Sequence, residues 1–235
     1  MNNPSLEILY EDNHIIAVNK RPSDIVQGDK TGDKPLSDFV KEYIKEKYQK
    51  PGEVFLGTVH RIDRPVSGIV IFARTGKALT RLNEMFRSKE VQKTYWAVVK
   101  NRPLKERDHL VHYLLKNEAK NMSRAYSEER NGALKSELDY RLLFSTDNYH
   151  LIEIKPATGR HHQIRVQLST IGSPIKGDIK YGFNRTNPNA SIHLHARKVE
   201  FIHPVKKEPV IITANPPRDV LWDEFLKMER QVKIS

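Results

Sequence analysis

The chain has 235 residues and no cysteine. Without a thiol it can form no disulfide, no thiolate nucleophile and no cysteine-ligated zinc or iron–sulfur cluster. Long apolar runs are also missing, since a stretch such as Ile69–Ala73 ends after five residues, whereas a membrane-spanning helix needs about 20. The N-terminal residues contain neither the basic segment nor the apolar segment of a secretory signal. These absences predict a cytoplasmic protein with no membrane partner.

Acidic residues are in the minority: 29 Asp and Glu face 40 Lys and Arg, which leaves a formal net charge of +11. The excess is uneven, because residues 74–107 hold ten basic against three acidic side chains, and residues 155–207 hold ten against two. Two basic blocks suggest a polyanionic partner, of which nucleic acid is the commonest. A plain solubility charge explains the excess equally well, so charge alone identifies no chemistry.

Apolar periodicity predicts both helices and strands. Helices are expected from Leu36 to about residue 50, after Thr75, after Gly159, and from about Asp219 to Val232. Strand-like runs rich in β-branched and aromatic residues lie at 15–18, 66–73, 94–99, 137–144, 149–155, 192–202 and 209–213. Many strands interrupted by a few helices, without regular alternation, predict an α+β fold with a mixed, mainly antiparallel sheet and flanking helices. With no repeat and no linker, residues 1–235 are predicted to form one domain.

The densest cluster of reactive side chains is the segment HRIDRPVSG, residues 60–68, which leads into the apolar run Ile69–Ala73. In it Asp63 lies between Arg61 and Arg64, and such positive neighbours favour the ionised carboxylate. An ionised, immobilised carboxylate can serve as nucleophile, general base or metal ligand. The alternative is a capping or ion-paired aspartate that merely organises a loop.

A second cluster is TGRHHQIR, residues 158–165. If this segment is helical, His161 and Arg165 lie four residues apart and away from the apolar positions Ile164 and Leu168. The amide groups at a helix N-terminus also favour a bound phosphate or carboxylate. A solvated cationic helix face is the alternative reading of the same residues.

Two further strands carry chemically interesting side chains. In KTYWAVV, residues 93–99, Tyr95 and Trp96 point to opposite faces, and an aromatic ring that faces a cleft can stack on a nucleobase. His193 and His195 share one face of another strand, which is one way to begin a metal site, but no third ligand follows at a typical spacing. No nucleotide-binding or metalloprotease motif is present. The sequence therefore predicts no metal and no cofactor.

Together these segments resemble the RluA-type family of RNA pseudouridine synthases. HRIDRPVSG resembles the family's HR-[LI]-D-R-x-[TS]-S-G motif, and KTYWAVV resembles its K-x-Y-x-A-x-V strand. PATGRHHQIR, GDIKYG and IHLHA resemble three later motifs in the same order, so that the likeness runs from about Leu9 to Pro217. The resemblance implies the fold of that family and an isomerase that converts a uridine in structured RNA, a ribosomal or transfer RNA stem-loop, to pseudouridine.

The resemblance also implies roles for residues of this chain. Asp63 corresponds to the catalytic aspartate, and Arg165 to the cation that orients it. Tyr95 corresponds to the ring that lies against the flipped uracil, and Arg61 to the side chain that fills the vacated place in the RNA stack. The other residues expected to bind substrate are Arg64, Arg160, His161 and Gln163. Such enzymes need neither metal nor organic cofactor, and no obligate protein partner is evident.

The chain departs from the family pattern in three places. Val66 stands where threonine is usual, and Gln167 replaces a frequent histidine. The residues Arg21-Pro22-Ser23-Asp24 stand where the family usually has Lys-Pro-x-Gly. The S4-type RNA-binding domain of many relatives is expected to be absent, because the catalytic pattern begins almost at residue 1.

Three other functions fit parts of the pattern: a non-catalytic RNA-binding relative, a metal-dependent RNA nuclease that uses His193 and His195, and a ribonuclease with two histidines as acid and base. Asp63, Tyr95 and Arg165 are all retained, which disfavours the first, and the histidine-based alternatives leave Asp63 and its flanking arginines without a role.

Overall fold

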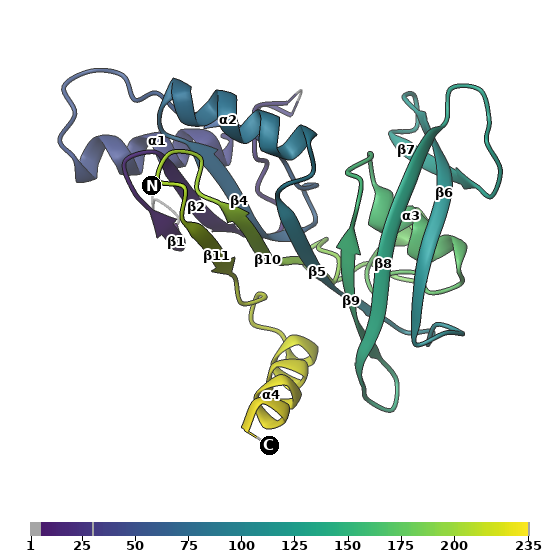
Figure 1. Ribbon diagram of the computed structural model, residues 1–235. Coiled ribbons are helices and arrows are strands. Elements are labelled where there is room, and N and C mark those ends of the chain that lie inside the picture. The colour runs from purple at the N-terminus through teal and green to yellow at the C-terminus, as the bar shows by residue number, and fades with distance from the viewer. Residues whose placement is uncertain (1–5, 30, 235) are drawn as a thin grey trace. The chain divides into compact units, whose positions relative to one another are not determined.

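The computed structural model describes residues 6–29 and 31–234. The chain separates into two compact units, each assembled from two segments. The first unit comprises Met1–Lys93 and Ala196–Asn215, and the second comprises Thr94–His195 and Pro216–Ser235. Both are built on antiparallel strand pairs flanked by helices (Figure 1), which confirms the predicted α+β class. The single domain remains a prediction.

In the first unit the strands follow the order β1-β2-β4-β10, with β11 paired to β10 and the short β3 paired to β4. Their bounds are β1 Ile8–Glu11, β2 Ile15–Lys20, β3 Gly57–Thr58, β4 Ser67–Ala73, β10 Leu194–Ile202 and β11 Pro209–Thr213. The pairs β1–β2, β2–β4, β3–β4 and β10–β11 are antiparallel. Two helices belong to this unit, α1 (Leu36–Lys47) and α2 (Gly76–Arg87).

Strand β4 lies at the centre of the first unit, and all seven of its residues are buried. Ile69 and Ile71 pack in one apolar cluster with Ala78 and Leu82 of α2. Helix α2 begins as predicted, because the Thr75 hydroxyl accepts a hydrogen bond of 3.2 Å from the backbone N–H of Ala78. The loop that carries Asp63 therefore leads into one of the best-packed strands of the unit.

The second unit has the strand order β5-β9-β8-β6-β7, and each neighbouring pair is antiparallel. The bounds are β5 Gln92–Val99, β6 Arg107–Asn117, β7 Met122–Tyr126, β8 Leu134–Ser145 and β9 His150–Pro156. Helix α3 (Gln163–Thr170), the 3₁₀ turn η1 (Ile179–Tyr181) and α4 (Val220–Ile234) complete it. Trp96 and Val98 of β5 pack with Trp222 and Phe225 of α4, so that β5 has the predicted core face.

The hairpin of the long strand β6 and the short strand β7, teal in Figure 1, was not among the predicted strands. Strand β6 alternates buried residues such as Leu110 and Leu114 with exposed ones such as Arg107 and Val111. An apolar residue at an exposed position, Val111, obscures the two-residue period. The hairpin matters for the site because β7 contacts helix α3.

Candidate active site

Asp63 lies in the loop between β3 and β4, within the first unit. Ile62 and Val66 on either side of it are buried and anchor the loop in the apolar interior. The carbonyl of Asp63 accepts a hydrogen bond of 3.0 Å from the N–H of Val66, which closes a tight turn. This anchoring leaves the Asp63 carboxylate half-buried and the Arg61 side chain exposed. Val66 thus preserves the entry to β4 despite its departure from the family pattern.

Lys20, at the end of β2, ties this turn to a second loop. Its side chain is only 1% exposed, and its ammonium donates hydrogen bonds to the carbonyls of Arg21 (2.9 Å), Asp24 (2.8 Å) and Arg64 (3.1 Å). The N–H of Ser23 donates to the same Arg64 carbonyl at 2.9 Å. The loop that departs from the family pattern at Ser23-Asp24 is therefore bound directly to the residue after Asp63.

Burial lowers the pKa of the Lys20 ammonium to about 7, although the charges of Asp24 and Asp63 act in the opposite direction. Three carbonyl acceptors match the three donors of a protonated ammonium. Lys20 thus places an amine that is only partly protonated at neutral pH in the neighbourhood of Asp63. Lys20 was not predicted to be a site residue; it lies two residues after the apolar run Ile15–Val18, where a lysine is ordinarily exposed.

The depressed pKa of Lys20 makes a prediction about stability. Between about pH 7 and 10.5 the unfolded chain holds a proton on Lys20 that the folded chain has released, so this residue makes folding more favourable as pH rises. The free energy of unfolding should increase by up to about 1.4 kcal/mol per pH unit through this residue. The Lys20→Met variant should lack this increase. Urea unfolding at pH 6, 8 and 9 measures it. Lys41→Met, at a half-exposed position on α1, is the control; equal slopes in the native and Lys20→Met proteins would contradict the prediction.

Arg64 has a different partner from the one that its position suggests. The sequence analysis placed it beside Asp63 as a flanking positive charge, but its guanidinium forms an ion pair with Asp33 and donates a hydrogen bond of 3.0 Å to the Thr31 hydroxyl. Arg64 therefore fixes the loop at 31–33 through its side chain, and the Asp63 turn through its carbonyl.

His60, the first residue of the HRIDRPVSG segment, is held in place by contacts with β4 and α2. Its Nε2 accepts a hydrogen bond of 2.9 Å from the N–H of Ile71, and its ring stacks on Phe86 with centroids 4.8 Å apart. Burial, reinforced by the charge of Lys93, lowers the pKa of His60 to about 3. A ring that stays neutral at physiological pH and accepts a backbone hydrogen bond is suited to holding the loop against β4, and does not suit the histidine-based ribonuclease.

The remaining predicted residues belong to the second unit. Tyr95 on β5 pairs with Ile154 of β9, is half-buried, and points away from the core face formed by Trp96. Arg165 lies in α3 and is buried; its Nε and Nη2 donate to the two carboxylate oxygens of Asp178 at 2.7 and 2.9 Å. Asp178 and the nearby Tyr181 belong to the GDIKYG segment, which carried the resemblance without an assigned role.

Helix α3 differs from the predicted amphipathic helix. It begins at Gln163, because His162 adopts a left-handed conformation with φ of 55°. His161 consequently lies outside the helix, and Arg165 faces the interior together with Ile164 and Leu168. The expectation that His161 and Arg165 lie on one helix, away from Ile164 and Leu168, is wrong, and so is the alternative of a solvated cationic face. A buried arginine with a dedicated carboxylate replaces it.

The residues that precede α3 form a tightly bonded turn. The Gln163 side-chain oxygen accepts from the Thr158 hydroxyl (2.7 Å) and the Arg160 N–H (3.0 Å), and its amide donates to the carbonyl of Glu137 (3.0 Å). Arg160 itself is exposed. His161 bonds Ser123 and Asn121 of the β6–β7 hairpin. Gln163 therefore shapes the turn, while Arg160 extends from it.

Gln167, another departure from the family pattern, is completely buried in α3. Its amide donates to the carbonyls of Leu110 on β6 and Ser136 on β8, each at 3.3 Å. It also lies 3.0 Å from the ring nitrogen of His112. The glutamine thus joins the helix to two strands and supplies its own hydrogen bonds where a histidine is usual.

His193 has both ring nitrogens engaged, one by Asn187 and the other by Asp219, each at 3.0 Å, and it stacks on Trp222. Within residues 6–29 and 31–234 no three His, Asp or Glu side chains are grouped in a way that could hold a metal ion. The helices described there include none that is long and apolar enough to cross a membrane.

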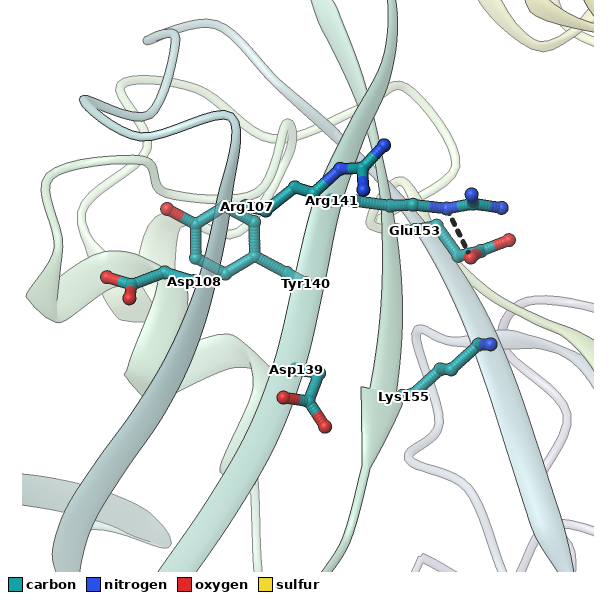
Figure 2. Close-up of a pocket in the computed structure, with 7 residues that line it drawn as sticks. All are labelled: Arg107, Asp108, Asp139, Tyr140, Arg141, Glu153 and Lys155. Carbon is teal, nitrogen blue, oxygen red and sulfur yellow. Dashed lines mark hydrogen bonds and ion pairs between the residues drawn. The ribbon is translucent and has the colours of Figure 1, made fainter.

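A cavity of about 420 Å³ opens on the outward face of β6, β8 and β9 (Figure 2). Figure 2 shows both acidic and basic side chains around it, and Arg141 and Glu153 are paired at 2.7 Å. Its lining consists of Arg107, Asp108, Asp139, Tyr140, Arg141, Glu153 and Lys155. None of these residues carries a role in the motifs, and the balanced charge does not favour a polyanion.

The fold is that of RNA pseudouridylate synthases. The chain is similar to the human RNA pseudouridylate synthase domain containing 4, with a TM-score of 0.77 and 24% identity over 93% of this chain and 92% of the other. A second human structure, domain containing 1, has a TM-score of 0.70 and 21% identity over 98% and 96% of the two chains. At these identities the likeness establishes the fold.

Sequence relatives establish the family. The RNA pseudouridylate synthase family matches residues 14–170. The chain is 30% identical to tRNA pseudouridine synthase C of Vibrio cholerae over 94% of both chains, and 32% identical to that of Haemophilus influenzae over 94% of this chain and 96% of the relative. It is also 34% identical to the ribosomal large subunit pseudouridine synthase C of Vibrio cholerae, over 95% of this chain and 69% of the relative.

The chain therefore belongs to the RNA pseudouridylate synthase family, in its RluA-type branch, as its motifs indicated. It is an RNA pseudouridine synthase, an enzyme that isomerises uridine in RNA.

Proposed function

We propose that the substrate is a transfer RNA, and that Asp63 is the nucleophile. Several relatives named as tRNA pseudouridine synthases match this chain over nearly their whole length, 94% of the Vibrio cholerae protein and 96% of the Haemophilus influenzae protein, although the one from Pectobacterium carotovorum matches over 59% of its length. The large-subunit rRNA enzyme of Vibrio cholerae matches over only 69% of its length. The near end-to-end likeness is the observation that favours tRNA over rRNA.

Isomerisation breaks the C1′–N1 bond of uridine, turns the uracil and joins C1′ to C5, with the C5 proton lost to solvent and N1 protonated. A carboxylate suits this chemistry because it can bond covalently to the nucleoside and leave again. Asp63 has the required setting: a tight turn closed by Val66 holds its backbone, and the buried Lys20 binds the Arg64 carbonyl of the same turn. In the proposal Arg165 orients the carboxylate.

A uridine within folded RNA must leave its stack before it reacts, at a cost of a few kcal/mol. We assign the compensation to Arg61, whose exposed side chain fills the vacated place, and to the Tyr95 ring, whose stacking on the uracil contributes about 1–3 kcal/mol. Arg64, Arg160, His161 and Gln163 remain predicted substrate-binding residues. The cytoplasmic location and independence from a protein partner also remain predictions.

Tritium release tests the substrate, because formation of the C5–C1′ bond expels the hydrogen of C5. Transcripts of tRNA and of large-subunit rRNA fragments, each made with 5-tritiated uridine, are incubated with the purified chain. Release from tRNA at one site per molecule, with that site mapped as pseudouridine, is expected. Release from the rRNA fragments alone would overturn tRNA as the substrate, and release from neither would overturn the proposed reaction on these RNAs.

A further inference from the structure

We propose that Asp178 and Tyr181 are positioning residues for Arg165, and that Asp178 acts as its permanent counter-ion while Asp63 is covalently bonded to the nucleoside. This inference rests on the proposed roles of Asp63 and Arg165. All contacts that carry it lie within the second unit, around helix α3 and the turn η1.

The pairing of Arg165 with Asp178 determines the direction of the guanidinium. Two parallel hydrogen bonds, from Nε at 2.7 Å and from Nη2 at 2.9 Å, use both carboxylate oxygens. The two side chains are 6% and 1% exposed, so that water hardly competes with this fork. A guanidinium is planar and rigid. The Asp178 carboxylate binds one side of the guanidinium, at Nε and Nη2. Because the group is rigid, this also fixes the direction in which Nη1 points.

Tyr181 provides the second constraint, because the Arg165 Cζ lies 5.1 Å from the centroid of its ring. The Tyr181 hydroxyl accepts a hydrogen bond of 2.8 Å from the N–H of Ser123 on β7. The same hydroxyl forms a second hydrogen bond, of 2.8 Å, with the Nδ1 of His162. The ring beneath Arg165 is thus fixed by a strand on one side and by the residue before α3 on the other.

The charge balance explains why a second carboxylate is needed. If Asp63 were the sole partner of Arg165, formation of a covalent bond would remove the carboxylate charge and leave a buried guanidinium without compensation. Such a cation would attract water or move away from its position. Because Asp178 is bound through both oxygens and does not react, it keeps Arg165 compensated and in place, ready to receive the carboxylate that is regenerated when product forms.

A double-mutant cycle tests this inference with Asp178→Asn, Arg165→Met and the combined variant. Asp178→Asn keeps the size of the side chain and removes its charge. We expect kcat for tritium release from tRNA to fall roughly 100-fold, the loss typical of a misplaced catalytic group, with the Kd for tRNA within about three-fold. Because Asp178 acts through Arg165, adding Asp178→Asn to Arg165→Met should lower kcat by less than about three-fold more.

Tyr181→Phe and Asp139→Asn complete the design. Tyr181→Phe keeps the ring and removes the hydroxyl, so we expect kcat to fall about ten-fold without a loss of thermal stability large enough to unfold the chain. This variant keeps the proposal testable if Asp178→Asn does not fold. Asp139→Asn removes an exposed carboxylate from β8 of the same unit and should leave kcat unchanged.

The outcomes separate this inference from the proposed function. A native kcat in Arg165→Met would refute the proposed role of Arg165 in orienting Asp63. A low kcat in Arg165→Met together with native kcat in both Asp178→Asn and Tyr181→Phe would overturn only the positioning role. Equal, additive losses from Asp178→Asn in the presence and absence of Arg165 would also overturn it, because they would show a general structural effect.

Discussion

Replacement of Asp63 by asparagine is expected to reduce tritium release from tRNA to the background of the assay, while the affinity for tRNA changes by less than about three-fold. The amide is nearly the same size as the carboxylate but carries no charge and is a poor nucleophile, so the covalent step cannot proceed. Binding should persist because basic side chains that contact phosphates supply most of the affinity of such proteins. The turn itself is held by backbone hydrogen bonds and by buried Ile62 and Val66.

Single-turnover tritium release measures the chemical step of Asp63→Asn, and gel-shift titration measures its affinity. Asp38→Asn removes a half-exposed carboxylate from α1 of the same unit and serves as the control, with native activity expected. Mass spectrometry of the purified variant excludes deamidation back to aspartate. Turnover by intact Asp63→Asn at the native rate would refute the assignment of Asp63 as nucleophile.

Features with strong local causes could be predicted from the sequence. The unbroken apolar run of β4 predicted a strand buried on both faces, and Thr75 predicted the start of α2 through its hydroxyl. The alternation of Trp96 with Tyr95 predicted that the two rings lie on opposite faces of β5, and the structure shows that the Trp96 face is the core. Each of these depends on neighbours a few residues away, where period and capping rules apply. The motifs identified the family by the same kind of local pattern.

Contacts between distant segments could not be predicted in this way. Lys20 contacts the carbonyl of Arg64, 44 residues away, and Arg64 pairs with Asp33 rather than with its neighbour Asp63. Helix α3 was expected to expose Arg165, because an arginine four residues after a histidine indicates a polar face. Asp178, thirteen residues further along the chain, neutralises that arginine and allows it to be buried. Buried charges and their partners become evident only in three dimensions.

The two halves of the proposed catalytic pair are supported in the same manner. Lys20 and the Asp63 turn meet at the Arg64 carbonyl, while Arg165 is held by the Asp178 carboxylate. In the first case a buried ammonium from a distant segment fixes the backbone of the turn, and in the second a buried carboxylate fixes the guanidinium itself. Precise positioning of this kind gives a larger rate effect than additional binding energy, because it acts in the transition state.

Substitutions of Arg165 and Arg160 are expected to produce opposite kinetic signatures. Arg165→Met removes a buried guanidinium that, in the proposal, orients Asp63, so we expect kcat to fall roughly 1,000-fold with little change in the Kd for tRNA. Arg160→Met removes an exposed cation at the entry of α3, where a phosphate is the expected partner. It should weaken binding several-fold, reduce the salt dependence of Kd by about one counterion, and leave kcat within about two-fold.

Saturating and sub-saturating tritium-release kinetics, combined with Kd measured from 50 to 200 mM salt, separate the two effects. Methionine at both positions matches the change in side-chain size, so that the comparison isolates the surroundings of each arginine. In the proposal the buried arginine acts in chemistry, because its direction is fixed by Asp178, whereas the exposed arginine, whose Nε lies 3.5 Å from the Lys135 carbonyl, acts in binding. If Arg160→Met lowered kcat as much as Arg165→Met did, burial and pairing would not distinguish the two roles, and the orientation of Asp63 would have to be sought in another residue.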